Sequence, residues 1–337
     1  MGTYSSTLTK LFSKILLGGK FPHAWKHDRR TPIHKPDTDT TDVSNYRLLA
    51  IHSVFRKLFC TIIDRRLRQF IELDDAQNAF RQRRRTTDNV LILQGFLRIA
   101  SRERNGAHVL VADFRKAFDS CHIPTLITKL AARGVGGVML RVIADMYTGA
   151  KARLIVNGVL GRPFYVTQGV AQGCALSPLF FDIYIDDLLL KFRESGLGVP
   201  LGALTQSALS FADDLILLSS NEDDTEQYLH ILDSWCRNNH LFINPKKSGI
   251  LRVGAMCEKP LRRYKIHNTP IQYLDEKDPY FENIREFKYL GFCIPKSGDW
   301  KKTFDFRLGK ARQALGQYRT FFYDAEVRIS LKLRLAP

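Results

Sequence analysis

Three aspartates stand where carboxylates could act together. Asp113 directly follows a short apolar run, and Asp213 and Asp214 lie between the apolar runs 208–211 and 215–218. An ionised carboxylate beside apolar segments is costly unless a cation offsets its charge. Mg²⁺ takes such oxygen ligands and keeps positions open for water and phosphates, and two such ions can stabilise both oxygens of a phosphoryl displacement. Each aspartate alone would be an ordinary turn residue, but together they predict a two-metal phosphoryl-transfer centre.

The elements that must position these acids read as short strands with helices around them. Residues 108–113 form a β-rich run that stops at Asp113, and residues 208–218 read as two strands joined by a tight Ala-Asp-Asp turn. A further hairpin is indicated around Asn157-Gly158. The spacing of apolar residues predicts helices over 8–16, 54–73, 87–102, 122–134, 137–148, 177–193 and 224–239.

The remaining segments carry weaker signals. Residues 28–45 are rich in Asp, Thr and Pro and predict a loop after a short strand. Beyond about residue 255 we expect short strands near 285–294 and a basic helix at the end of the chain. The outline predicts an α+β fold in which a small antiparallel sheet has helices packed on one side.

Composition narrows the class of partner. The chain has 337 residues, enough for two or three packed subdomains, and 51 Lys and Arg against 34 Asp and Glu give a net charge of +17. This excess favours a polyanion such as nucleic acid, although ribosomal and membrane-surface proteins are also basic. The six scattered cysteines read as reduced thiols of an intracellular protein. No apolar run is long enough to span a membrane, and no secretory signal is found.

Around the acids, the chain resembles the reverse transcriptases, in particular those of the non-LTR retrotransposon (LINE-like) type. Any one motif is weak, but the ordered set is specific and covers roughly residues 20–295. The palm motifs are similar to residues 113–119 (DFRKAFD), 168–178 (QGVAQGCALSP), 211–214 (FADD), 244–248 (NPKKS) and 287–291 (FKYLG). The fingers motifs are similar to residues 32–35 (PIHK) and 45–47 (NYR), and the next block of the family to residues 77–81 (QNAFR).

The resemblance implies a right-hand polymerase, with fingers, a palm whose antiparallel sheet is backed by helices, and a partial thumb. We expect the N-terminal segment and fingers over 1–107 and the palm over 108–255, with fingers elements interleaved. The palm end with the primer-grip region would cover 256–295, and the start of a thumb, truncated, 296–337. The chain would then be a piece of a longer element.

The resemblance also implies roles at the catalytic centre. Asp113 and Asp213 would hold two Mg²⁺ ions (Mn²⁺ is an alternative), with Asp214 a weaker partner. Lys247 would lie near the leaving pyrophosphate as a general acid or charge partner, and Lys246 is its rival.

Nucleotide binding is implied for a second set of residues. Lys35 and Arg47 would bind the triphosphate, and Gln172 and Gly173 would approach the nascent base pair, where glycine permits close backbone contact. Phe118 would lie under the sugar and leave no room for a 2′-hydroxyl, which predicts selection of deoxynucleotides.

Primer and template contacts complete the expected site. Tyr289, Leu290 and Gly291 would form the turn that grips the primer end. The exposed basic side chains would contact the template backbone without reading its sequence, and a solvated charged face is the alternative. They are Arg83, Arg84, Arg85 and those expected outside the helix over 54–73, namely Arg56, Lys57, Arg65, Arg66 and Arg68.

The function that follows is RNA-directed DNA polymerisation, adding dNTPs to the 3′-hydroxyl of a DNA or RNA primer on an RNA template. Leu48 and Ala175 stand where the family often has Pro. A group II intron-type reverse transcriptase/maturase and a degenerate RNA-binding domain without activity are the alternatives. We expect no membrane association, no obligate protein partner, and an intracellular location, in the nucleus if the retrotransposon is eukaryotic.

Overall fold

The structure is a computed structural model that describes residues 2–36, 38–104, 106–201, 204–274, 288–293 and 300–317. Its helices are α1 (Gly2–Gly18), α2 (Val54–Leu67), α3 (Thr86–Ala100), α4 (Ala117–Ser120), α5 (Ile123–Ala132), α6 (Gly137–Tyr147), α7 (Ser177–Glu194), α8 (Glu222–Asn238) and α9 (Trp300–Gln317). Short 3-10 turns lie at η1 (His23–Lys26), η2 (Val43–Asn45) and η3 (Gly254–Glu258).

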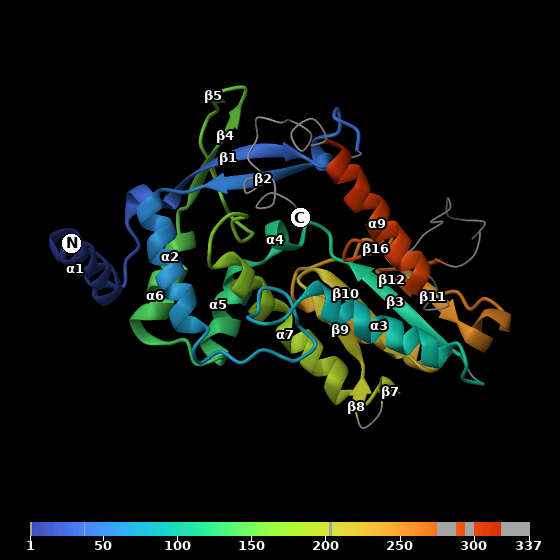
Figure 1. Cartoon of the computed structure of the whole chain (residues 1–337). Helices are drawn as coiled ribbons and strands as arrows, with labels where there is room; N and C mark the ends of the chain where they lie inside the picture. The colour runs from blue at the N-terminus through green and yellow to red at the C-terminus, as the bar shows by residue number, and fades with distance from the viewer. Residues whose placement is uncertain are drawn as a thin grey trace.

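The strands fall into two larger sheets and several short hairpins (Figure 1). In chain order they are β1 (His27–His34), β2 (Tyr46–Ile51), β3 (Ala107–Asp113), β4 (Lys151–Val156), β5 (Val159–Leu160), β6 (Phe164–Tyr165), β7 (Val199–Leu201), β8 (Leu204–Gln206), β9 (Ala208–Phe211), β10 (Asp214–Ser219), β11 (Gly249–Val253), β12 (Lys265–Ile266), β13 (Thr269–Pro270), β14 (Gln272–Tyr273), β15 (Lys288–Tyr289) and β16 (Phe292–Cys293).

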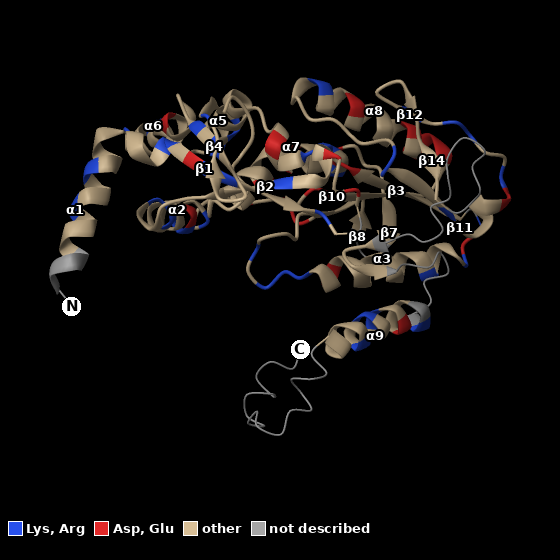
Figure 2. Cartoon of the chain, turned by 90° about the horizontal axis from the view of Figure 1, so that it is seen from above, with Lys and Arg blue, Asp and Glu red and all other residues tan. Residues whose placement is uncertain are grey.

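The sheet that carries the acids has the order β14-β11-β3-β10-β9, with β3 and β10 antiparallel at its centre. Leu110 and Leu217 on these strands belong to the core formed with α7 and α8, whereas Val109 and Leu218 belong to a second core formed with α3. Figure 2 shows α8 and α3 on opposite sides of β3. Helices therefore cover both faces of this sheet, and the expectation of one covered face is wrong.

The second sheet has the order β2-β1-β4-β5, and β6 also pairs with β4. Its strand β1 falls within the segment predicted as a loop, so that prediction is wrong for residues 28–34. The partner of β1 on one side is β4, more than a hundred residues later in the chain, with Arg29 beside Arg153. Pairing with a distant strand outweighs the polar local composition.

The predicted basic helix over 54–73 is shorter and less exposed than expected. Helix α2 ends at Leu67, and Arg68 turns back to donate to Asp64 (2.9 Å) and to the carbonyl oxygen of Phe80 (2.9 Å). Arg56 is buried against Asp28, so it cannot contact a template from the surface. The exposed basic residues of this helix are Lys57, Arg65 and Arg66.

The end of the described chain lies over α3. Gln94 of α3 donates to the buried Thr303 hydroxyl of α9 at 2.9 Å, and Figure 2 shows α9 beyond α3. Residues 275–287, 294–299 and 318–337 of the predicted primer-grip and thumb regions lie outside the described residues. Within the described ranges, no helix combines the length and apolar character needed to cross a bilayer.

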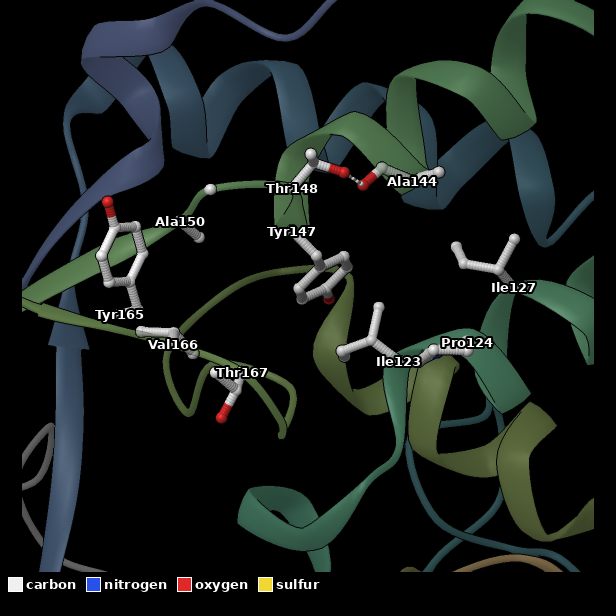
Figure 3. Close-up of a pocket in the computed structure, with 11 residues that line it drawn as sticks. Ile123, Pro124, Ile127, Ala144, Tyr147, Thr148, Ala150, Tyr165, Val166 and Thr167 are labelled. Atoms are coloured by element: carbon white, nitrogen blue, oxygen red, sulfur yellow. Dashed lines mark hydrogen bonds between the residues drawn. The ribbon is translucent and has the colours of Figure 1, made fainter.

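A cavity of about 590 Å³ lies between α5, α6 and the strand β6 (Figure 3). Its lining is mostly apolar, with Ile123, Ile127 and Tyr147 on one side and Tyr165 and Val166 on the other. None of the predicted site residues lines it, so it is separate from the acids.

Candidate active site

The three predicted acids meet at one end of the central sheet. Asp113 is the last residue of β3 and lies directly opposite Asp214, the first residue of β10, in the antiparallel register. Opposed Cα atoms in such a ladder are about 4.5–5.5 Å apart. Asp213 occupies the turn between β9 and β10, next to Ala212, whose backbone is left-handed (φ +56°). The fold thus brings together a strand-end acid and a hairpin-tip pair from segments about a hundred residues apart.

The acids disturb one another's protonation. Burial is the largest effect, and it raises the pKa of Asp113 and of Asp213. Burial, followed by the charges of Asp213 and Asp113, raises the pKa of Asp214 to about 6. Asp214 is also exposed to solvent, which screens part of this repulsion. Burial and the repulsion between the acids therefore make their ionised forms costly, and a bound cation would offset that cost.

The segment 244–248 docks on Asp113 and brings Lys247 to the acids. The backbone N–H of Asn244 donates to the carbonyl oxygen of Asp113 (2.8 Å), and the backbone N–H of Asp113 donates to the Ser248 hydroxyl (3.0 Å). Lys247 is exposed, and its positive charge lowers the pKa of all three acids. The choice of Lys247 over Lys246 stays a prediction.

Two further cations, Arg47 on β2 and Lys35 just after β1, act on the acids through their charge. The charge of Arg47 lowers the pKa of Asp213, and the charge of Lys35 lowers the pKa of Asp113. Arg47 is exposed on β2, and the Lys35 ammonium donates to the carbonyl oxygen of Ser44 at 3.0 Å. An anionic group beside the acids would therefore be within the field of both side chains.

Phe118 packs against two other aromatic rings. Its ring stacks on the buried Phe181, with centroids 4.8 Å apart, and meets Phe80 edge to face at 6.4 Å. Phe118 itself is only partly buried. Because the buried Phe181 supports one face of the ring, Phe118 cannot move back in that direction and can act as a wall.

The loop with Gln172 and Gly173 touches β2. The backbone N–H of Ala50 donates to the carbonyl oxygen of Gln172 at 2.7 Å, and the Gln172 side chain donates to Asp119 at 3.1 Å. Gly173 has φ +106°, and a Cβ there would lie 2.7 Å from the Ala50 oxygen. Only glycine therefore allows this loop to approach β2 so closely.

The predicted primer turn lies near the acids. Leu290 (φ +50°) and Gly291 (φ +77°) form the turn of the β15–β16 hairpin, and Tyr289 is 3% exposed. Burial raises the pKa of Tyr289. The Tyr289 hydroxyl accepts a hydrogen bond from Asn89 at 2.9 Å. Asn89, which also donates to the carbonyl oxygen of Ser210 just before the Asp213 turn, links this hairpin to the acids.

The predicted template arginines are exposed but not equivalent. Arg84 is paired with Asp75 at 2.8 Å, whereas Arg83 takes a left-handed backbone (φ +62°) and Arg85 precedes the first turn of α3. Sequence reasoning assigned no role to Gln77 or Asn89, which contact the Asp213 turn, or to Asn244. The resemblance of residues 77–81 to the family block that follows the fingers motifs was the available signal for Gln77.

The donor set suits a hard divalent cation. Among the residues that the structure describes, no three His, Cys, Asp or Glu side chains are arranged to hold one ion between them. Mg²⁺, however, is usually bound by one or two carboxylates together with water and substrate phosphates. Asp113 and Asp213 provide such carboxylates, and burial, which raises the pKa of both, makes their ionised forms costly until a cation offsets the charge.

Comparison with known proteins defines first the class and then the family. Telomerase from Candida tropicalis, solved with a fragment of telomeric RNA, superposes with a TM-score of 0.55 at 12% identity, over 87% of this chain and 47% of that one. The truncated apo telomerase of the same organism gives 0.53 at 13% identity, over 88% and 60%. The chain therefore has the fold of a right-hand polymerase, which confirms the predicted fold class.

Sequence relatives are more specific. Residues 33–294 match the family Reverse transcriptase (RNA-dependent DNA polymerase). The chain is 29% identical over 296 residues to the retrovirus-related Pol polyprotein from type-1 retrotransposable element R2 of Popillia japonica, over 86% of this chain and 40% of that protein. It is 25% identical over 302 residues to the Pol polyprotein from type-2 retrotransposable element R2DM of Drosophila melanogaster, over 87% and 27%.

The chain belongs to the reverse transcriptase family, as the motifs predicted. Members of this family generally use divalent metal ions. These relatives are proteins of non-LTR retrotransposons, so the group II intron-type alternative is not favoured. The chain spans less than half the length of these two Pol polyproteins.

Proposed function

We propose that this chain carries the nucleotidyl-transfer centre of a non-LTR retrotransposon reverse transcriptase. It would add dNTPs to the 3′-hydroxyl of a DNA or RNA primer on an RNA template. The observation that carries the proposal is the register that sets Asp113 opposite Asp214, with Asp213 in the adjoining turn. The alternative of an inactive RNA-binding domain is less well supported, because all three acids are present and clustered.

The residues divide the chemistry among them. Asp113 and Asp213 would hold two Mg²⁺ ions, or Mn²⁺, which when bound would stabilise the attacking and leaving oxygens of the phosphoryl transfer. Arg47 and Lys35, whose charges already act on the acids, would bind the triphosphate. Lys247 would donate a proton to the leaving pyrophosphate or stabilise it with its positive charge.

Nucleotide choice would depend on the packed aromatic ring. Phe118 is held on Phe181, so it cannot retreat from a ribose 2′-hydroxyl. Gln172 and Gly173 are fixed against β2 and would contact the nascent base pair. The site should therefore prefer dNTPs over rNTPs.

Template binding would use the exposed basic surface. Arg83 and Arg85 belong to this surface. A polar cavity of about 300 Å³ on the sheet that contains β1 and β4 adds to it, and is lined in part by His27, Arg29, Lys151 and Arg153. Arg29 and Arg153 are side by side in register, and like charges so placed repel each other unless an anion lies between them. A phosphate of an RNA strand would relieve that repulsion. Acting on nucleic acid, the protein would be intracellular, and nuclear if its element is eukaryotic.

The decisive test is primer extension on poly(rA)/oligo(dT) with dTTP and Mg²⁺ or Mn²⁺. Wild type should extend the primer, and Asp213→Ala should abolish extension. Asp305→Ala, the same change at an exposed site on α9, is the matched control and should remain active. Equal activity of wild type and Asp213→Ala would reject the site, and a preference for rNTPs would reject the role of Phe118.

A further inference from the structure

Three buried amide side chains surround the turn that carries Asp213. Gln77, Asn78 and Asn89 are each at most 3% exposed. They come from the loop before α3 and from the first turns of α3, which lies against β9 and β10 in Figure 1. None has a place in the chemistry proposed above. A buried polar group must be hydrogen-bonded to persist, so its partners show what it holds.

Gln77 is bonded to the end of β9 and to the first residue of the turn. Its Oε1 atom accepts from the backbone N–H of Ala212 at 3.1 Å, and its Nε2 atom donates to the Ser210 hydroxyl at 3.1 Å. The backbones on either side of Gln77 also pair with Ser210, at 2.8 and 3.0 Å. Ala212 has a left-handed backbone (φ +56°), which costs free energy for a residue with a Cβ. The hydrogen bond to its N–H holds that conformation just before Asp213.

Asn89 joins this turn to the predicted primer turn. Its Nδ2 atom donates to the carbonyl oxygen of Ser210 at 3.2 Å and to the Tyr289 hydroxyl at 2.9 Å. Its Oδ1 atom accepts from the Asn78 amide, and the Asn78 oxygen accepts from Arg84 at 3.2 Å. One buried side chain thus contacts two segments whose positions relative to each other decide where a primer end meets Asp213.

We propose that Gln77 and Asn89 are positioning residues, which fix the Asp213 turn and set its distance from the Tyr289 turn. The inference rests on the proposed function, since it gives these residues a purpose in nucleotidyl transfer. A displacement of about 1 Å at reacting groups can lower a rate by roughly 100-fold, so amides that touch no substrate would control the rate.

The first test removes the amide of Gln77 at nearly constant volume. Gln77→Met should lower kcat by roughly 10- to 100-fold with little change in the KM for dTTP. Amide hydrogen exchange of peptides spanning 208–216, measured in EDTA, should become faster in this variant. Gln94→Met is the matched control, because Gln94 is equally buried on α3 but bonds to Thr303 instead. It should lose stability without changing exchange at the turn.

The second test cuts only the link between the turns. Tyr289→Phe removes the hydroxyl that Asn89 reaches and keeps the buried ring. It should lower kcat by roughly 3- to 10-fold and raise the KM for primer-template. In an Asn89→Leu background the same change should add almost nothing, because the two residues act through one contact.

Equal exchange at 208–216 in Gln77→Met, Gln94→Met and wild type would overturn the proposal, as would additive effects of Tyr289→Phe and Asn89→Leu. If Gln77→Met does not fold, Ser210→Ala takes its place, because it removes the hydroxyl to which Gln77 donates. Unchanged hydrogen exchange at 208–216 and unchanged kcat in Ser210→Ala would also overturn the proposal. The exchange measurement needs neither metal nor catalysis. It therefore tests the network even if the wild-type chain fails to extend a primer.

Discussion

The acid cluster should destabilise the metal-free protein at neutral pH, and Asp214→Asn should relieve it. Burial and the neighbouring acids raise the pKa of Asp214 from 3.8 to about 6. A raised carboxyl pKa means that the folded state favours the protonated form. This favourable contribution is complete below about pH 4 and is lost as the pH rises through about 6.

The magnitude follows from the two pKa values. The difference between 3.8 and about 6 corresponds to an upper value of about 3 kcal/mol in the free energy of unfolding. Because the Asp214 side chain is exposed, solvent screening reduces this to about 1 kcal/mol. Asp214→Asn should therefore raise the melting temperature in EDTA by roughly 2 °C at pH 7.5 and by almost nothing near pH 4.

Thermal unfolding of wild type and Asp214→Asn in EDTA, at several pH values between 4 and 7.5, measures this difference. Asp305→Asn, the same chemical change on the exposed face of α9, should not show it at any pH. A melting temperature of Asp214→Asn at or below that of wild type at pH 7.5 would contradict the expected electrostatic effect. So would a difference in melting temperature that does not depend on pH.

Four further outcomes are expected. Gly173→Ala should lower the free energy of unfolding by about 2 kcal/mol, measured by denaturant titration, because the left-handed backbone and the Ala50 oxygen both oppose a Cβ. Phe118→Val should weaken discrimination against rNTPs by roughly 10- to 100-fold in single-nucleotide incorporation. Replacing Arg29 and Arg153 together by Gln should lower the slope of log affinity against log salt for RNA by about 2, measured by fluorescence anisotropy, whereas Lys at both positions should preserve it. Mg²⁺ should raise the melting temperature of wild type more than that of Asp213→Asn.

Local signals in the sequence were sufficient to predict the hairpin that carries Asp213 and Asp214. The apolar runs on both sides of Asp213 and Asp214 specify two strands, and the run before Asp113 specifies a third. Each of these strands is apolar on both faces, which is the pattern of a sheet covered on both sides. That pattern was present in residues 109–112, yet it was interpreted as a sheet covered on one side only.

What the sequence could not provide were contacts between distant segments. Strand β1 was missed because its partner β4 begins at Lys151, and Arg56 was placed outside because its partner Asp28 lies on another element. Gln77 reaches Ser210 across 133 positions of the chain. The spacing of apolar and polar residues does not predict such pairs. It describes only neighbours along the chain, whereas the partner of each of these side chains depends on the fold.

The groups that fix the acids and the groups that would bind phosphate differ in charge. Neutral side chains hold the backbone at the acids: Gln77 at Ala212, and Ser248 at Asp113. A buried Arg or Lys in those places would form ion pairs and compete with a metal for the carboxylates. Of the cations whose charges act on the acids, Arg47 and Lys247 are exposed and can turn toward a substrate, whereas Lys35 is partly buried. We therefore expect the negative charge of the acids to be available to a metal ion and the positive charge of the cations to phosphate, because uncharged hydrogen bonds hold the backbone at the acids.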